Sequence, residues 1–120
     1  MELVEDKHSS KFNVTKYKEG SIIINNNTFT QPIVFHDEKI AYFKITKPNL
    51  ISINDMEKYL NSTDLILIGT GEFNIIPNEI LIKEMCDRSK GLEFMNTISA
   101  CKTHNLLISE NRSFVTILYP

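Results

Sequence analysis

The stretch that decides the fold is Asp64-Leu65-Ile66-Leu67-Ile68-Gly69-Thr70-Gly71. Its four aliphatic residues are consecutive, so neither face of the strand that they predict is polar. A strand with two apolar faces is typical of the interior of a parallel sheet that is covered on both sides. We therefore expect residues 65–68 to form a central strand that ends at the turn Gly69-Thr70-Gly71.

The character of the chain changes on either side of residues 46–50. Upstream, short β-branched runs separated by turn residues predict an antiparallel meander (1–46) with strands at about 12–17, 21–24, 33–35 and 39–45. Downstream, residues 50–120 alternate between helix and strand, with a second inner strand at 92–95 and a last strand at 113–119. The predicted fold class is α/β: a single compact domain over residues 1–120, with a mixed β-sheet flanked by helices and an additional N-terminal antiparallel β layer.

Capping residues predict where the helices of the second half begin and end. Ser52 or Asn54 begins the first helix, and Asn54 resembles part of a capping box. The second helix opens near residue 77, and we expect Gly91 to terminate it. Thr97 or Ser99 caps a third helix that runs to about residue 108.

Composition excludes several classes of protein. The 120 residues are 42% hydrophobic and 23% charged, which is typical of a globular domain. With Lys plus Arg at 13 and Asp plus Glu at 15, the formal charge is −2, so we expect neither nucleic acid nor an anionic membrane surface as a partner. No apolar run is long enough to insert across a bilayer. Residues 1–11 have no apolar signal core and are not Arg-rich, so we expect a cytoplasmic location.

The cysteines and histidines do not predict a metal site, a disulfide scaffold or a bound cofactor. Cys86 and Cys101 are far apart, and His8, His36 and His104 are not at ligand spacing from a Cys or another His. Cys101 and His104 are three residues apart on one predicted helix face, where a nucleophile and a base could meet. The same spacing puts both on the apolar stripe of the helix, so we favour core packing over catalysis.

The strongest local feature is the turn Gly69-Thr70-Gly71, because open α/β sheets bind ligands at the carboxyl ends of their strands. It lacks the third glycine of a dinucleotide fingerprint and the Lys-Ser/Thr pair of a phosphate loop, and Glu72 would repel a phosphate. A tight turn with glycines at positive φ is the simplest interpretation. A loop that binds a small ligand or a protein partner is the second, and a nucleotide site is the third.

Residues 96–112 are rich in polar side chains for a helix that must also bury one face. Thr103 is more often a hydroxyl that bonds back to its own helix than a nucleophile. Asn105 is a poor helix former, which suggests that it satisfies a loop backbone or binds a ligand. Glu110 and Arg112 predict a salt bridge at the end of the helix. If Arg112 is partly buried, it would instead be a clamp for a carboxylate or a phosphate.

Residues 60–120 resemble a family of small uncharacterised domains that includes mitochondrial complex I assembly factor 3 and the adipogenesis-associated domain protein of animals. The resemblance lies in the spacing of these blocks: Asp64–Gly71, Gly91–Met95, Thr97, Ala100, Thr103, Asn105–Leu107, Ser109, Glu110 and Arg112. It implies a compact α/β domain with a further β layer, no established enzymatic activity, and a stand-alone bacterial member. For the mitochondrial protein it implies an assembly role through protein contacts. This chain has His104 where the family usually has Tyr.

Three hypotheses about function follow. The first is a non-enzymatic protein-interaction or assembly-factor-like domain, accessory to respiratory-complex assembly, with a protein partner and no catalytic residue. Its candidate functional surface is Gly69, Thr70, Gly71, Thr97, Thr103, Asn105, Glu110 and Arg112. Arg112 follows the far end of the third helix, where a separate structural contact is the alternative. The second is a small-molecule or anion-binding enzyme that uses the turn Gly69-Thr70-Gly71. The third is a homo-oligomer in which strand edges of the meander pair between subunits.

Overall fold

The computed structural model of the chain describes residues 12–120. His8 and the absence of a targeting segment in residues 1–11 therefore lie outside the described part. The strands are β1 (Val14–Lys18), β2 (Ser21–Ile24), β3 (Asn27–Phe29), β4 (Ile33–His36), β5 (Lys39–Tyr42), β6 (Leu65–Gly69), β7 (Gly91–Met95) and β8 (Val115–Leu118). The helices are the 3-10 turn η1 (Pro48–Leu50) and the α-helices α2 (Ile53–Leu60), α3 (Glu79–Asp87) and α4 (Thr97–Ser109).

The strands form two sheets. A five-stranded sheet has the order β5-β4-β8-β6-β7, in which β6 is parallel to β7 and β8, and β4 is antiparallel to β5 and β8. A three-stranded antiparallel sheet has the order β1-β2-β3. This arrangement confirms the predicted α/β fold class with a mixed sheet, flanking helices and an N-terminal antiparallel layer.

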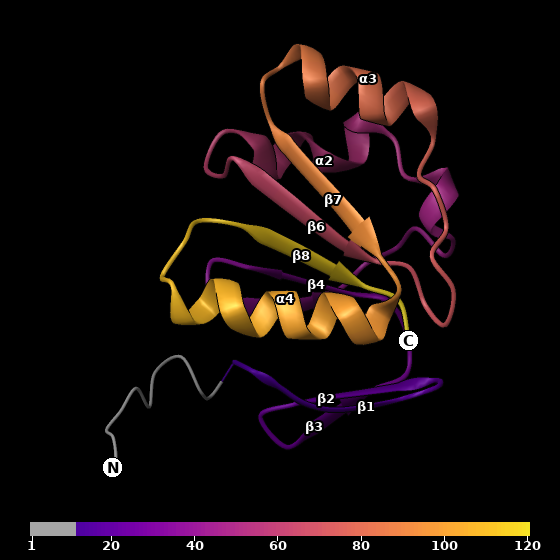
Figure 1. The fold of residues 1–120 in the computed structure, drawn as a ribbon, viewed down its shortest axis with the longest axis vertical. Helices are drawn as coiled ribbons and strands as arrows, with labels where there is room; N and C mark the ends of the chain where they lie inside the picture. The colour runs from indigo at the N-terminus through magenta and orange to yellow at the C-terminus, as the bar shows by residue number, and fades with distance from the viewer. Residues whose placement is uncertain (1–11) are drawn as a thin grey trace.

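Strand β6 is the interior strand that the sequence predicts. It lies between β8 and β7, and every one of its residues is buried. Ile66 and Ile68 pack into a core with residues of α2 and α3, such as Met56 and Met85. Leu65 and Leu67 pack on the opposite face with α4 and the three-stranded sheet. Figure 1 shows the resulting layers, with α2 and α3 on one side of the larger sheet and α4 with the smaller sheet on the other.

The predicted four-stranded meander is instead divided between the two sheets. Strands β4 and β5 join the larger sheet, because Ile33, Val34 and Phe35 are all buried and need cover on both faces. The pairing of β4 with β8 supplies that environment. Strand β3 was missed by the sequence patterns. Asn25 and Asn26 have φ of 52° and 67°, which completes a two-residue turn and lets residue 27 begin a new strand at once.

The second half agrees with the sequence expectations at the start of α2 and differs from them at the end of α3 and in the position of β7. Helix α2 is capped by Ser52, one of the two predicted caps, and the Asp55 carboxylate completes the capping box by accepting a 2.8 Å hydrogen bond from the Ser52 N–H. Helix α3 ends at Asp87, and Ser89 at φ 58° turns the chain so that Gly91 begins β7. Strand β7 is an edge strand of the larger sheet and not an inner one.

Within residues 12–120 we find no helix with the length and hydropathy needed to cross a bilayer.

Candidate functional site

The turn after β6 is shaped by two glycines with different requirements. Gly71 has a φ of +99°, a conformation that side chains with a Cβ rarely adopt. Gly69 is needed for close approach, since a Cβ at this position would lie 2.9 Å from Cβ of Ala100. Helix α4 therefore packs directly against the end of β6.

Thr97 ties this turn to the residue that follows the last strand. Asn96 caps α4 by accepting a 2.9 Å hydrogen bond from the N–H of Ser99, so Thr97 is the first residue of the helix and neither predicted cap is the one used. Thr97 Oγ1 accepts from the Gly71 N–H at 2.7 Å and donates to the carbonyl of Tyr119 at 2.6 Å. Thr97 is fully buried. These contacts place the turn and the start of α4 side by side at the carboxyl edge of the sheet.

Thr70 shapes the segment that follows the turn. Its hydroxyl donates to the carbonyl of Phe73 at 2.6 Å and accepts from the N–H of Ile75 at 3.0 Å. Its own N–H donates to the carbonyl of Met95 at 2.8 Å. Thr70 is buried, so its hydroxyl serves the protein's own backbone. An anion above the turn would find the Thr70 and Thr97 hydroxyls already engaged.

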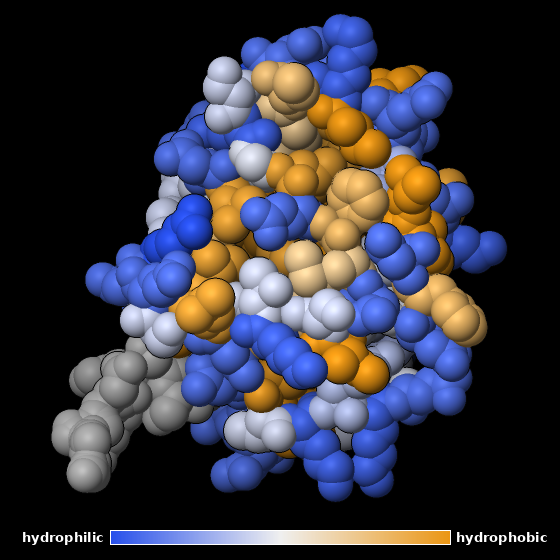
Figure 2. Space-filling view, in the orientation of Figure 1, coloured by the Kyte–Doolittle hydropathy of each residue, from blue (hydrophilic) through white to orange (hydrophobic). Residues whose placement is uncertain are grey.

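The segment held by Thr70 exposes a group of large apolar side chains that the sequence patterns did not single out. Phe73 is 70% exposed, Ile76 is 69% and Ile80 is 67%, and Ile75 is also exposed. We call these four residues the apolar segment. Figure 2 shows hydrophobic residues across the upper half of one face and along its right-hand margin, where the chain runs from β6 to α3 in Figure 1. In the sequence, the signal for this segment is the pair Ile75-Ile76, two branched aliphatic residues between a predicted strand and a predicted helix.

Acidic residues flank the apolar segment. A hydrogen bond between the side chains of Glu19 and Glu72 raises the pKa of Glu72 and brings the turn between β1 and β2 close to this region. Glu79 follows at the start of α3, and the sequence has no Lys or Arg between residues 70 and 82. The stretch of sequence that contains the apolar segment therefore carries acidic residues and no basic ones.

Asn105, in the middle of α4, binds a strand and not a loop or ligand. Its Oδ1 accepts from the N–H of Val14 at 2.8 Å, and its Nδ2 donates to the carbonyl of Val14 at 3.1 Å. The side chain thus pairs with β1 as a neighbouring strand would, and it holds the smaller sheet against the helix. Thr103, the other predicted residue of this part of α4, contacts Sδ of Met95 at 3.5 Å.

His104 and Cys101 are part of the core. His104 Nε2 lies 3.1 Å from the carbonyl of Phe12, so it carries the proton, and Nδ1 accepts from the hydroxyl of Thr116 at 2.9 Å. Burial lowers the pKa of His104 to about 4 and raises the pKa of Cys101 to about 12. Both ring nitrogens have other partners, so His104 is not placed to act as a base for Cys101.

Glu110 and Arg112 follow the far end of α4. Their nearest side-chain atoms are 3.9 Å apart, and the Arg112 side chain is 56% exposed. Helix α4 has 13 residues, so about 20 Å separates them from Thr97.

The eight predicted residues thus form three groups and not one surface. Gly69, Thr70, Gly71 and Thr97 meet at the carboxyl edge, Thr103 and Asn105 lie along α4, and Glu110 and Arg112 lie at the opposite end. Among residues 12–120, no group of three His, Cys, Asp or Glu side chains is placed to hold a metal ion.

Comparison with known proteins gives a family. The family described as "Protein of unknown function (DUF498/DUF598)" matches residues 14–119, and the chain belongs to it. A relative from Francisella tularensis subsp. holarctica, named "13 kDa major membrane protein", is 29% identical over an alignment of 121 residues. The alignment covers 98% of this chain and 98% of the relative.

Solved structures agree with this fold. The crystal structure of a Bordetella parapertussis protein is 27% identical, with a TM-score of 0.79 over 90% of this chain and 94% of that one. The solution structure of a Bordetella pertussis protein described as a Mth938-like domain has a TM-score of 0.78 over 100% of this chain and 92% of that one. At 23% identity, the second likeness concerns the fold alone.

Proposed function

We propose that this member of the DUF498/DUF598 family is a non-enzymatic protein-interaction domain of the assembly-factor type, and that it binds its partner through the apolar segment. The observation that supports this proposal is the exposure of Phe73, Ile75, Ile76 and Ile80 within eight residues of chain. Exposed apolar groups of this kind mark interaction surfaces, and aromatic anchors dominate the free energy of binding at them.

The segment is also held in place before a partner arrives. The Thr70 hydroxyl binds the backbone of Phe73 and of Ile75, and the turn before it is fixed to α4 through Thr97. A loop held in its binding conformation loses less conformational entropy when it binds. This gives the buried polar residues at the carboxyl edge a role in function: they shape the surface that makes the contact.

The charge around the segment favours a protein over a lipid surface. Glu72 and Glu79 flank the exposed side chains, and carboxylates are repelled by the anionic lipids of a cytoplasmic leaflet. A partner with an apolar groove and a basic rim fits this pattern. If the partner is a membrane complex, such as a respiratory complex during assembly, it would bring the chain to the membrane without a spanning helix. The name of the Francisella relative is consistent with that arrangement.

The test is affinity capture of the full chain from detergent-solubilised membranes of its host. The bait variant Phe73→Ser/Ile76→Ser removes the centre of the apolar segment. The matched control, Ile98→Ser/Leu106→Ser, removes two exposed apolar side chains of α4. We expect the wild type and the control to recover the same membrane-complex subunits and the first variant to lose them. Deletion of the gene should slow assembly of that complex, as followed on native gels.

Two results would refute the proposal. One is equal recovery by both double variants, which would place the contact elsewhere. The other is flotation of the purified wild-type chain, but not of Phe73→Ser/Ile76→Ser, with vesicles of phosphatidylglycerol and phosphatidylethanolamine. That result would make lipid, and not protein, the partner of the apolar segment.

A further inference from the structure

A cavity of about 330 Å³ lies at the end of the molecule opposite the apolar segment. It is bounded by the turn between β4 and β5, by Ser62 before β6, by Ser113 before β8, and by the end of α4. Its lining combines aromatic, polar and charged side chains: Phe12, Phe35, His36, Asp37, Glu38, Ser62, Ile108, Asn111, Arg112, Ser113 and Phe114. This volume is in the range of small-molecule sites, which combine apolar walls with a few polar groups that orient the ligand.

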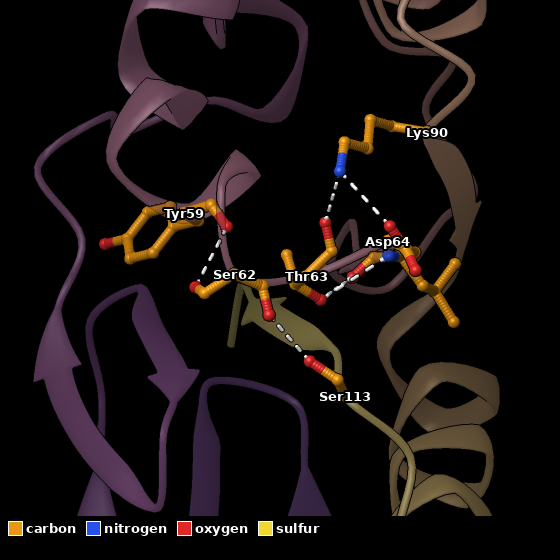
Figure 3. A network of polar contacts seen from close by, with 7 residues as sticks. Tyr59, Ser62, Thr63, Asp64, Lys90 and Ser113 are labelled. Carbon is orange, nitrogen blue, oxygen red and sulfur yellow. Dashed lines mark hydrogen bonds and ion pairs between the residues drawn. The ribbon is translucent and has the colours of Figure 1, made fainter.

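The walls of the cavity are held by contacts within the protein. Phe35 stacks on Phe114 with ring centroids 5.9 Å apart, which forms an aromatic wall. Ser113 donates a 2.8 Å hydrogen bond to the carbonyl of Ser62, as Figure 3 shows, and this bond joins the chain before β8 to the chain before β6. His36 Nε2 lies 3.1 Å from the hydroxyl of Ser62. The cavity is therefore formed in advance of any ligand.

The charged groups of the lining have both signs. Arg112 lies 3.9 Å from the Glu110 carboxylate, which is too long for a hydrogen bond, so its guanidinium keeps donors for a ligand. Asp37 and Glu38, which carry carboxylates, line the same cavity. The site can thus receive a negative and a positive group of one molecule at the same time.

The turn that supplies the carboxylates is costly to the fold. Asp37 and Glu38 have φ of 55° and 60°, and they form the two-residue connection between His36 and Lys39, which pair across β4 and β5. Such turns favour Asn-Gly, and the described chain has two other two-residue hairpins, which use Glu19 with Gly20 between β1 and β2 and Asn25 with Asn26 between β2 and β3. A glutamate in this conformation strains the backbone for no local gain. Strain of this kind collects at functional sites, where the side chain is needed for another purpose.

We propose that this cavity binds a small zwitterion of the amino-acid type with an aromatic or branched apolar side chain. Arg112 binds its carboxylate, the carboxylates of Asp37 and Glu38 bind its ammonium group, and the wall of Phe35 and Phe114 receives its side chain. Both charges of the ligand and its apolar part then have matched partners in one preformed cavity.

The test is an amide-resonance titration of the isotope-labelled full chain with three probes: phenylalanine, phenethylamine and 3-phenylpropionate. We expect phenylalanine to shift the resonances of cavity residues and to bind about tenfold or more tightly than either singly charged probe. The variant Arg112→Gln should bind phenylalanine and 3-phenylpropionate about tenfold more weakly and leave phenethylamine binding unchanged.

The variant Asp37→Asn/Glu38→Gly separates binding from folding. It installs the favoured turn, so we expect a higher melting temperature together with about tenfold weaker binding of phenylalanine and phenethylamine. The matched control, Asn26→Gly, relieves the same strain in the hairpin between β2 and β3 and should leave all three affinities unchanged. No shift at the cavity with millimolar phenylalanine would overturn the proposal. So would equal affinity for phenylalanine and a singly charged probe, or unchanged phenylalanine binding by the Asp37→Asn/Glu38→Gly variant.

Discussion

Replacing Thr97 with valine tests whether the carboxyl edge of the sheet is held by one buried hydroxyl. Valine has nearly the same shape, so the change removes two hydrogen bonds and creates no cavity. The N–H of Gly71, 2.7 Å from Oγ1, and the carbonyl of Tyr119, 2.6 Å from Oγ1, are then left unsatisfied in a buried site. Each buried group without a partner costs about 1–3 kcal/mol, so Thr97→Val should lower the free energy of unfolding by roughly 3 kcal/mol. Urea unfolding followed by circular dichroism measures this value.

The control is Thr97→Ser, which keeps the hydroxyl and removes only a methyl group. It should cost about 1 kcal/mol, because it deletes one buried carbon and preserves both hydrogen bonds. The order of the two variants is the decisive result. If Thr97→Val is as stable as Thr97→Ser, with unchanged dependence on urea, the hydroxyl does not hold the turn and the basis for a preformed apolar segment fails.

Two further changes test how α4 holds the smaller sheet. The pKa of His104 is about 4 when folded and 6.5 in its ordinary state, so the unfolded chain takes up a proton between these values and the folded chain does not. Stability should therefore fall by roughly 3 kcal/mol as the pH drops from 6.5 to 4, and urea unfolding of His104→Gln should lack this part of the pH dependence. Asn105→Leu removes both hydrogen bonds to Val14, so hydrogen exchange at the Val14 amide should accelerate about tenfold. Lys102→Ala, a change at an exposed position of the same helix, should leave that exchange rate unaltered.

The sequence determined the interior of the larger sheet well, because the information there is local. Four consecutive aliphatic residues predict a strand that is covered on both faces, and every residue of β6 is buried. The alternation of helix and strand after residue 50 likewise follows from short-range periodicity. The same rule was wrong for residues 92–95. An edge strand next to a buried neighbour also carries apolar residues, and nothing in the stretch itself shows which strand lies at the border.

The partition of the first half could not be predicted, because it depends on pairing with distant parts of the chain. Strand β4 pairs with β8 and not with the strands of the predicted meander before it. In this pairing Val34 lies opposite Ile117, more than eighty residues later in the sequence. The roles of Asn105 and His104 have the same origin. Both bind backbone groups of residues 12–14, and no local pattern in α4 indicates that partner.

The mixed direction of the strands explains why the proposed small-molecule site is at the unexpected edge. In parallel sheets the loops that follow the strands meet at the carboxyl edge, and ligands bind there. In this sheet that edge is filled by backbone, because the N–H of Tyr119 donates to the carbonyl of Gly69 at 2.8 Å and the Tyr119 carbonyl receives the Thr97 hydroxyl. Strand β4 runs antiparallel to β8, so the turn after it, with Asp37 and Glu38, arrives at the amino edge. The amino edge, which usually carries no functional site in such sheets, thus contains the polar turn of Asp37 and Glu38. The carboxyl edge instead holds the apolar segment in position.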